Sequence, residues 1–220
     1  SVHGIIVLNV YNERLLRLLA ETQIPKVFLD TSSLVSPDEL NGDLLLMESR
    51  NSVRNITAHL LEKGCTLPGF MGDIGYAQSN RERYEGFCQA LMDAGKTPNP
   101  SLCLTTPLGI DSYREEIDSF LSSLSRMPDA FVCASDYVAC ILMQLLEKRG
   151  LRVPEDVAVS GFDNNIEDLL AENLTTVQVF NEELGSRLAL QILYRIKYPH
   201  TPHEVTYLES KVLYRASTGD

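Results

Sequence analysis

The chain has 220 residues, of which 44% are hydrophobic and 22% charged, and its formal net charge is −11. The composition is typical of a soluble globular protein, and a surface this acidic repels phosphate backbones, which argues against DNA binding by this segment alone. No apolar run approaches the ~20 residues that cross a bilayer, and no charged-then-apolar leader opens the chain, so neither a membrane span nor a signal peptide is predicted.

Strands in the first half are predicted from apolar runs at residues 4–8, 27–30, 43–47 and 67–71. Helices alternate with them. Asn12 is the expected cap of the first helix, Ser52 begins the second, and Ser79 with Glu82 forms a capping box for a helix that ends near Ala94.

The second half continues the alternation. Helices are predicted after Ser112, over residues 138–150 and after an Asn181 cap, with strands at 130–134, 157–159, 175–179, 205–208 and 211–214. Alternation of this kind predicts an α/β fold with parallel, doubly wound sheets. We place the boundary between two lobes near Pro98, which gives an N-terminal lobe of residues 1–97 and a C-terminal lobe of residues 98–220. Chain crossings between the lobes are expected near 175–182 and 205–220.

The five cysteines lie at scattered positions and form no Cys-x-x-Cys pair: Cys65, Cys88, Cys103, Cys133 and Cys140. An odd, scattered set predicts buried thiols in a reducing compartment rather than a disulfide framework. The four histidines show no metal-ligand spacing either, so we expect no metal and no cofactor.

Four acidic residues each follow a predicted strand: Asp30, Asp73, Asp136 and Asp163. In a doubly wound fold the carboxyl ends of the strands converge on one crevice, where ligands bind. Ionised carboxylates there suit a ligand rich in hydroxyl donors. The alternative role is helix capping, which is favoured for Asp136 because a helix follows it at once. For Asp163 both roles stay open.

Two arginines, Arg81 and Arg83, fall in the first turn of the helix that Ser79 is predicted to cap. The helix dipole disfavours cations there by roughly 0.3–1 kcal/mol each. Their position indicates that at least one has a partner outside the helix. A guanidinium fork matches paired hydroxyls, a carboxylate or a phosphate.

A series of motifs runs in order along the chain, from Ile24-Pro25 and Leu29-Asp30 to the ending Arg215-Ala216-Ser217-Thr218. Between them stand R-Y-E-G-F at residues 83–87 and V-P-E-D-V-A-V-S-G-F-D-N at 153–164. This series resembles the lactose-repressor (LacI) family of bacterial transcription regulators over essentially the whole chain.

The resemblance implies two lobes of the periplasmic-binding-protein type I kind. The first lobe is expected to be incomplete: relatives open it with two more strand–helix units, and at ~30 residues per unit we expect on the order of 50 residues to be absent before Ser1. By resemblance Arg83 and Asp163 bind the effector, and we expect them to face each other from opposite lobes. Asp30, Ser79 and Ser135 are further candidates. Relatives often have a glutamine where Val179 stands, and Asn181 is a possible substitute.

The function implied is that of an effector-sensing domain. It would bind a small polar ligand, a sugar by resemblance, and control an upstream helix-turn-helix as a cytoplasmic homodimer on operator DNA. The alternative is a periplasmic sugar-binding protein of a transport system, which shares the fold. A Mg²⁺-dependent phosphoryl-transfer enzyme is a third possibility, but no paired aspartates and no nucleophile–base pair occur, so we do not expect an enzyme.

Overall fold

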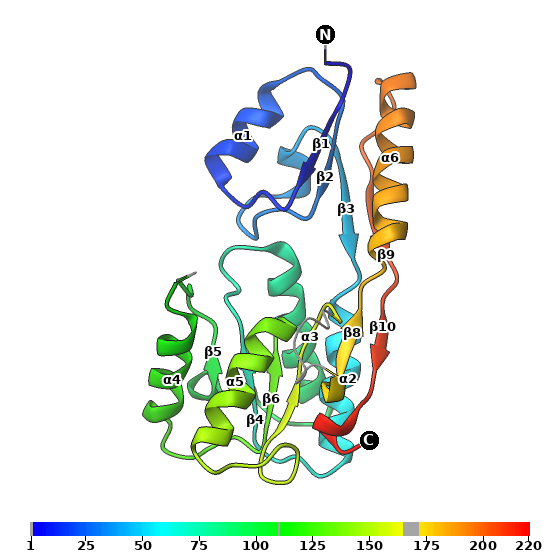
Figure 1. The fold of residues 1–220 in the computed structure, drawn as a ribbon. Helices are drawn as coiled ribbons and strands as arrows, with labels where there is room; N and C mark the ends of the chain where they lie inside the picture. Colours follow the sequence, from blue (N-terminus) through cyan, green and yellow to red (C-terminus); the bar gives the residue numbers. More distant parts are fainter. Residues whose placement is uncertain (1, 110, 165–171) are drawn as a thin grey trace.

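The computed structural model describes residues 2–109, 111–164 and 172–220, and these form two lobes, each built on a parallel sheet of four strands. The first lobe lies at the top of Figure 1 and holds the N-terminus, and the second lies below it with the C-terminus. The predicted α/β class with two parallel-sheet lobes is confirmed.

The sheet of the first lobe has the order β1 (Ile5–Leu8), β2 (Lys26–Leu29), β3 (Asp43–Met47) and β9 (Val205–Leu208). Helix α1 (Glu13–Glu21) covers one face and α6 (Asn181–Lys197) the other. Successive residues of a strand point to opposite faces of the sheet, so neighbouring residues contact different helices. Phe28 therefore packs with Leu16 of α1, and its neighbour Val27 packs with Ile192 of α6.

The sheet of the second lobe has the order β5 (Cys103–Leu104), β4 (Pro68–Met71), β6 (Ala130–Cys133) and β7 (Ala158–Ser160). One face packs on α2 (Arg50–Glu62) and α3 (Gln78–Asp93), the other on α4 (Tyr113–Ser123) and α5 (Asp136–Lys148). Short 3-10 turns lie at Pro37–Glu39, Pro100–Leu102 and Ala216–Thr218.

The close packing of α2 on α3 explains the glycine in the R-Y-E-G-F motif. A Cβ at Gly86 would come 2.1 Å from the carbonyl oxygen of Arg50, so only glycine fits where the two helices approach each other. This packing holds α3, and the residues at its start, in a fixed place on the second lobe.

The chain passes between the lobes after β3, after β8 (Thr176–Gln178) and after β9. The last two passages fall within the ranges 175–182 and 205–220. Strand β8 is connected to the end of the second sheet by single parallel bridges, Ser160 to Thr175 and Asp163 to Gln178. It pairs antiparallel with β10 (Lys211–Leu213) in a two-stranded ribbon beside α2.

The predicted lobe boundary near residue 98 disagrees with the division into lobes that strand pairing gives. Strand β4 pairs with β5 on one side and β6 on the other, which places it in the middle of the second sheet. Residues 49–97 therefore belong to the second lobe, and the first lobe is built from residues 2–48 and 181–208. The boundary was wrong because pairing partners, which decide lobe membership, are distant in sequence.

None of the helices in the described part of the chain has the length and apolarity that crossing a lipid bilayer requires.

Candidate functional site

A cavity of about 540 Å³ lies between the two lobes, where the carboxyl ends of strands from both sheets meet. This volume lies within the range of about 300–1,000 Å³ usual for small-molecule sites. Its lining is mostly polar and comes from both lobes and from the ribbon that joins them. The polar and aromatic residues of the lining are Asn9, Tyr11, Asp30, Asp73, Tyr76, Ser79, Asn80, Arg83, Tyr113, Ser135, Asp163, Asn164, Gln178 and Asn181.

Several lining residues have left-handed backbones. Asn9 and Asp30 follow β1 and β2 directly, with φ of 50° and 59°, and Asp163 has φ of 108° after β7. Asn and Asp adopt this region more readily than other residues with a Cβ, but it still costs energy. Such conformations concentrate at functional sites, where they turn a side chain toward a ligand.

Arg83 of α3 is the only cation among the described residues that line the cavity. Its guanidinium lies 3.6 Å above the centre of the buried Phe162 ring and donates to the Asn80 side-chain oxygen at 3.3 Å and to the carbonyl oxygen of Ala134. Nη2 lies 3.6 Å from Oδ1 of Asp163. With 8% of its surface exposed, the residue is held in place by these contacts.

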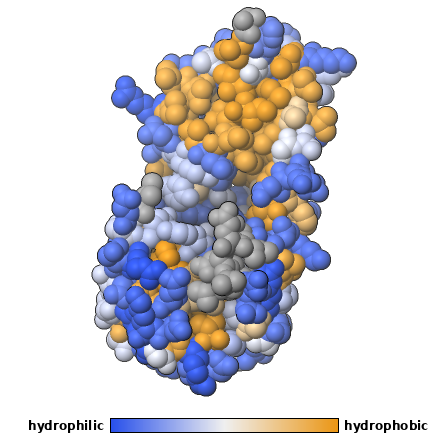
Figure 2. Space-filling model, viewed as in Figure 1, coloured by the Kyte–Doolittle hydropathy of each residue, from blue (hydrophilic) through white to orange (hydrophobic). Residues whose placement is uncertain are grey.

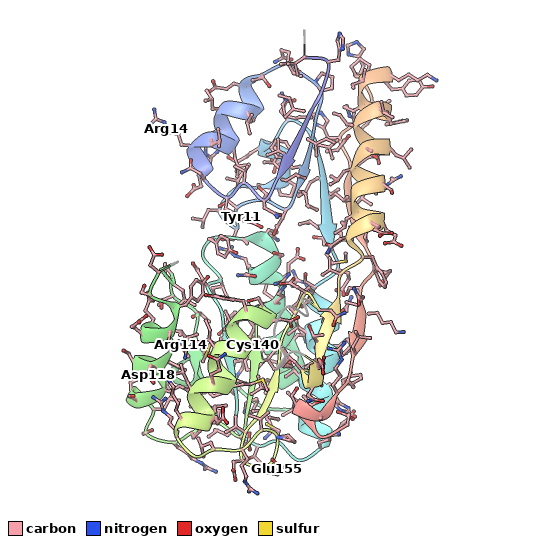
Figure 3. All side chains as sticks on the ribbon, in the orientation of Figure 1. Tyr11, Arg14, Arg114, Asp118, Cys140 and Glu155 are labelled. Carbon is pink, nitrogen blue, oxygen red and sulfur yellow. The ribbon has the colours of Figure 1, made fainter. Side chains whose placement is uncertain are left out.

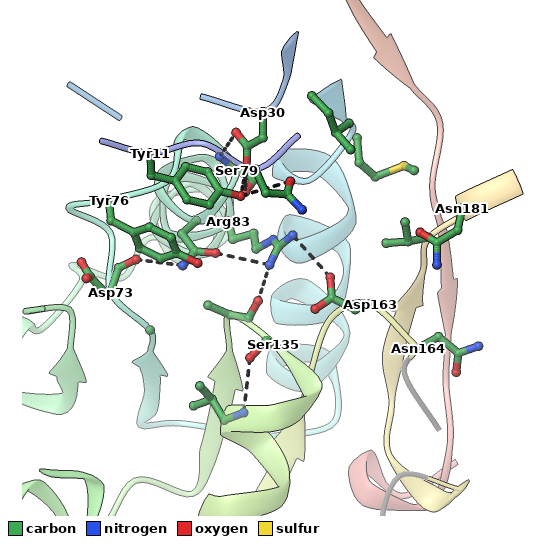
Figure 4. Close-up of a pocket in the computed structure, with 18 of the residues that line it drawn as sticks. Tyr11, Asp30, Asp73, Tyr76, Ser79, Arg83, Ser135, Asp163, Asn164 and Asn181 are labelled. Atoms are coloured by element: carbon green, nitrogen blue, oxygen red, sulfur yellow. Dashed lines mark hydrogen bonds and ion pairs between the residues drawn. The ribbon is translucent and has the colours of Figure 1, made fainter. Parts of the chain in front are cut away.

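Arg83 and Asp163 were expected on opposite lobes, and this was wrong. Helix α3 packs on the same sheet that β7 belongs to, so both residues lie on the second lobe and pair with each other. Figure 4 shows the pair side by side on one wall of the cavity.

Asp163 occupies an environment that opposes its ionisation. Burial raises the pKa of its carboxyl, and the nearby Arg83 charge lowers it in part. The side chain still keeps 43% of its surface exposed, toward the cavity. A carboxylate that is short of water yet open on one side is well placed to accept hydrogen bonds from a ligand.

Asp30 of the first lobe reaches across to the start of α3. Its carboxylate accepts from the Ser79 hydroxyl at 2.6 Å and from the Ser79 N–H at 3.3 Å. It also accepts from the Tyr11 hydroxyl at 3.2 Å and the Thr31 N–H at 2.8 Å. The carboxylate at this helix N-terminus therefore comes from the other lobe, where it complements the helix dipole.

The predicted capping box of Ser79 and Glu82 is wrong. Helix α3 begins at Gln78, its N-cap residue Ala77 makes no side-chain cap, and Ser79 donates to Asp30 instead. Glu82 accepts from the Tyr207 hydroxyl of β9 at 2.7 Å, a second contact between the lobes.

Three tyrosines line the cavity, and the sequence analysis did not find them. The rings of Tyr11 and Tyr76 meet edge to face at 4.7 Å between centres, and Tyr113 stands at the start of α4. Burial, followed by the charge of Asp30, raises the pKa of Tyr11, so its hydroxyl stays protonated as a donor. Figure 3 shows Tyr11 at the end of the first lobe that faces the second. Its place just after a strand was the signal available.

Ser135 and Asn181 also line the cavity. Ser135 is the N-cap of α5 and accepts from the Val138 N–H at 3.3 Å, which leaves its hydroxyl proton able to donate. Asn181 was predicted as a cap but is the first residue of α6, after Phe180. Beside Val179, Gln178 supplies a carboxamide to the cavity, one position before the site where relatives have glutamine.

Two predicted site residues lie elsewhere. Arg81 does not line the cavity, because it is two positions from Arg83 and two positions turn a helical side chain away. Asp136 is 3% exposed and accepts from the Thr176 hydroxyl at 2.6 Å. A Cβ at Gly161 would come 2.2 Å from its Oδ1, so Asp136 fixes the strand end from within the core.

Among the described residues, no group of three or more His, Cys, Asp or Glu side chains could hold a metal ion. The five cysteines are all free thiols. The cavity therefore offers hydrogen-bonding groups, one guanidinium and aromatic faces, a set suited to holding a polar organic molecule.

Residues 57–218 match the family of periplasmic binding protein-like domains. The chain is 29% identical over 220 residues to the "HTH-type transcriptional repressor PurR" of Aliivibrio salmonicida, with 98% of this chain and 64% of that protein covered. It is 30% identical over 170 residues to the "HTH-type transcriptional regulator DegA" of Bacillus subtilis, covering 76% and 48%.

Among solved structures, a "transcriptional regulator CelR-cellobiose complex" superposes with a TM-score of 0.86 at 26% identity, over 99% of this chain and 66% of that one. The chain thus spans about two thirds or less of the length of these three relatives. It belongs to the family of periplasmic-binding-protein-like domains, in the form that regulators of the lactose-repressor family carry.

Proposed function

We propose that this chain is the effector-sensing domain of a bacterial transcription regulator. It binds a small polar ligand between its lobes and passes the resulting change in lobe position to an upstream helix-turn-helix. The observation that carries the proposal is the interlobe cavity, where Arg83 and Asp163 of one lobe face Asp30 and Tyr11 of the other. A ligand that contacts both walls stabilises one arrangement of the lobes over others.

A sugar is the ligand class that fits this cavity. Carboxylates accept from hydroxyl donors, and tyrosine rings provide flat apolar faces for the C–H surface of a sugar ring. Two solved relatives support the choice: one is described as a cellobiose complex and another, 22% identical, as having bound ribose. Both sugars are therefore first probes.

Thermal denaturation with and without ligand tests the proposal. A ligand at 100 times its Kd adds about 2.7 kcal/mol to stability, which for a chain of this size raises Tm by roughly 5–10 °C. The screen contains cellobiose, ribose and other neutral sugars and nucleosides. Arg83→Ala should reduce the shift, and Arg81→Ala, outside the cavity, should retain it. A screen without any shift would contradict the proposal.

The regulator is favoured over a periplasmic sugar-binding protein because the relatives at 29–30% identity are named transcriptional regulators. This choice also implies a cytoplasmic location. We propose further that the domain acts by binding and not by catalysis. Turnover of phosphate esters in the presence of Mg²⁺ would contradict that.

Operator DNA would be bound through another part of the regulator. The net charge of −11 opposes binding of this chain to duplex DNA, so a mobility shift at low salt with the 220-residue chain should show none. A shifted band under those conditions would contradict this assignment.

We also propose a homodimer that forms through α6. Figure 2 shows apolar side chains gathered over the first lobe, where Leu190 and Leu193 of α6 are 60% and 63% exposed. Two copies of α6 packed antiparallel would place the exposed Glu182 and Glu183 of one beside Lys197 of the other. Light scattering should give a dimer for the natural chain and a monomer for Leu193→Asp, with Met92→Asp on the second lobe as control.

A further inference from the structure

We propose that the cavity selects uncharged, hydroxyl-rich ligands and rejects those with a phosphate or carboxylate, and that Asp73 enforces this choice. The inference rests on the proposed function and names the ligand class within it. Among the described residues that line the cavity, the charged side chains are three carboxylates, Asp30, Asp73 and Asp163, and one guanidinium, Arg83. Three negative charges against one positive charge leave the cavity at a formal −2.

Most of the single guanidinium is engaged by protein groups, although its buried Nε has no hydrogen-bond partner among the described residues. Arg83 donates to Asn80 and to the Ala134 carbonyl through Nη1, faces Asp163 through Nη2, and lies flat on the Phe162 ring. An incoming anion would have to compete with Asp163 for the same positive charge. The pair therefore attracts hydroxyl groups, which both donate and accept, better than it attracts a second anion.

Asp30 adds negative charge that no ion pair among the described residues offsets, and only the partial positive charge at the N-terminus of α3 lies against it. Its carboxylate accepts four hydrogen bonds, two from Ser79 and one each from Tyr11 and Thr31, and all four donors are neutral. Neutral donors orient the carboxylate without cancelling its charge. Asp30 therefore keeps the first-lobe wall negative while the lobes are together.

Asp73 follows β4 and adds a second negative charge, after that of Asp30, on the second-lobe side of the cavity. It lies next to the tyrosines. Its Oδ1 accepts from the Gly75 N–H at 2.7 Å, and its carbonyl oxygen accepts from the Asn80 side chain at 2.9 Å, so the loop is held in place. The pKa values of Tyr76 and Tyr113 are raised mainly by burial, and the negative charge of Asp73 raises both further.

This arrangement defines two chemical requirements on a ligand. Hydroxyl donors are needed opposite Asp73 and Asp163, because an ionised carboxylate only accepts and protein donors already occupy the four acceptor sites of Asp30. A flat apolar face is needed against the tyrosines. A phosphate group meets neither requirement and is repelled by each uncompensated carboxylate, by on the order of tenfold in Kd apiece at the separations of a small cavity.

Matched pairs of ligands provide the experiment. Calorimetry and thermal shift would compare ribose with ribose 5-phosphate, glucose with glucose 6-phosphate, and guanosine with its 5′-monophosphate. We expect at least one neutral member to bind, at least tenfold more tightly than its phosphorylated partner. A phosphorylated member that binds as tightly as its neutral partner, or more so, overturns the inference and leaves the proposed function intact. A shift from none of the six overturns both.

The variant Asp73→Asn tests whether Asp73 causes the weaker binding of phosphorylated ligands. Asparagine keeps the side-chain oxygen that accepts from Gly75, so the loop should fold as before. We expect this variant to reduce the preference for the neutral ligand, measured as the Kd of the phosphorylated ligand divided by the Kd of its neutral partner, by about tenfold. The reduction should be smaller at high salt, because salt screens the charge of Asp73. Asp38→Asn makes the same charge change on the exposed surface outside the cavity and should leave the ratio unchanged. Equal effects of the two variants would overturn the role of Asp73.

Discussion

The carboxylate of Asp30 accepts a hydrogen bond from the Ser79 hydroxyl at 2.6 Å and thereby joins the first lobe to the start of α3 on the second. The N–H of Gln78, the first residue of α3, donates to the Thr31 carbonyl at 2.9 Å, also across the cleft. Separation of the lobes would leave these N–H groups of α3 without protein acceptors. Because Arg83 is on the same helix, its position is linked to the arrangement in which these contacts hold the two lobes together, which we call the closed arrangement.

Asp30→Ala should therefore loosen the closed arrangement. The loss of a helix cap costs about 1 kcal/mol, within a range of about 0.5–2. We expect a lower Tm together with a larger radius of gyration in small-angle X-ray scattering, because the cap bridges two lobes. Asn12→Ala is the matched control: Asn12 caps α1 within the first lobe at 2.9 Å, so its loss should lower Tm without changing the radius. Equal radii for both variants would contradict the link.

The ion pair of Arg83 and Asp163 predicts non-additive binding effects. Arg83→Ala leaves a polar ligand group unpaired and should weaken effector binding by roughly 1–3 kcal/mol. Asp163→Ala should weaken it similarly, and because the two side chains lie 3.6 Å apart, the double variant should differ from the sum by at least about 0.5 kcal/mol. Calorimetry on the four proteins measures this. Unchanged affinity in both single variants would contradict the assignment of the site.

Much of this site could be predicted from the sequence because its residues follow apolar runs. Asp30 follows the apolar run Val27-Phe28-Leu29, and Asp163 comes shortly after the run Val157-Ala158-Val159. Parallel strands bring their carboxyl ends together. The two arginines predicted near the start of a helix indicated an external partner for Arg81 or Arg83, and the family resemblance selected Arg83, which lies beyond the first turn of α3. These are local signals that need no knowledge of the partner strand.

What could not be predicted depends on contacts between distant residues. Ser79 fits a capping box with Glu82, yet its hydroxyl donates to Asp30, 49 positions earlier. Strand β4 fits either lobe until its pairing with β6 is known. The lobe of Arg83 was misassigned for the same reason, since the lobe of α3 follows from the sheet on which it packs.

Asp163 also predicts a pH dependence of stability. Burial raises its folded pKa above the unfolded value of about 3.9, so the folded chain binds the proton more tightly and loses stability as pH rises through this window. Asp163→Asn removes the ionisation. We expect its Tm, without ligand, to exceed that of the natural chain at pH 7 and to approach it as pH falls below about 4.

Asp156 is a control of opposite sign. A hydrogen bond from Arg152 lowers the pKa of this exposed carboxyl to about 2, so its stabilising effect is present above about 3.9 and is lost as pH falls toward the folded value. Asp156→Asn should therefore lower Tm at pH 7. The same sign of change for both variants would contradict the environment assigned to Asp163.

The last prediction concerns the buried ion pair that anchors α6 to the first sheet. Arg195 is 2% exposed and donates to both carboxylate oxygens of Asp43, at 2.9 and 2.6 Å. Arg195→Met should destabilise the chain by about 3–5 kcal/mol, because it leaves Asp43 buried without its cation. Arg17→Met, which breaks the exposed pair with Glu39, should change little in chemical denaturation. Since Asn181 at the other end of α6 lines the cavity, effector affinity should fall with Arg195→Met as well. Full affinity in a destabilised Arg195→Met chain would show that α6 does not position the site.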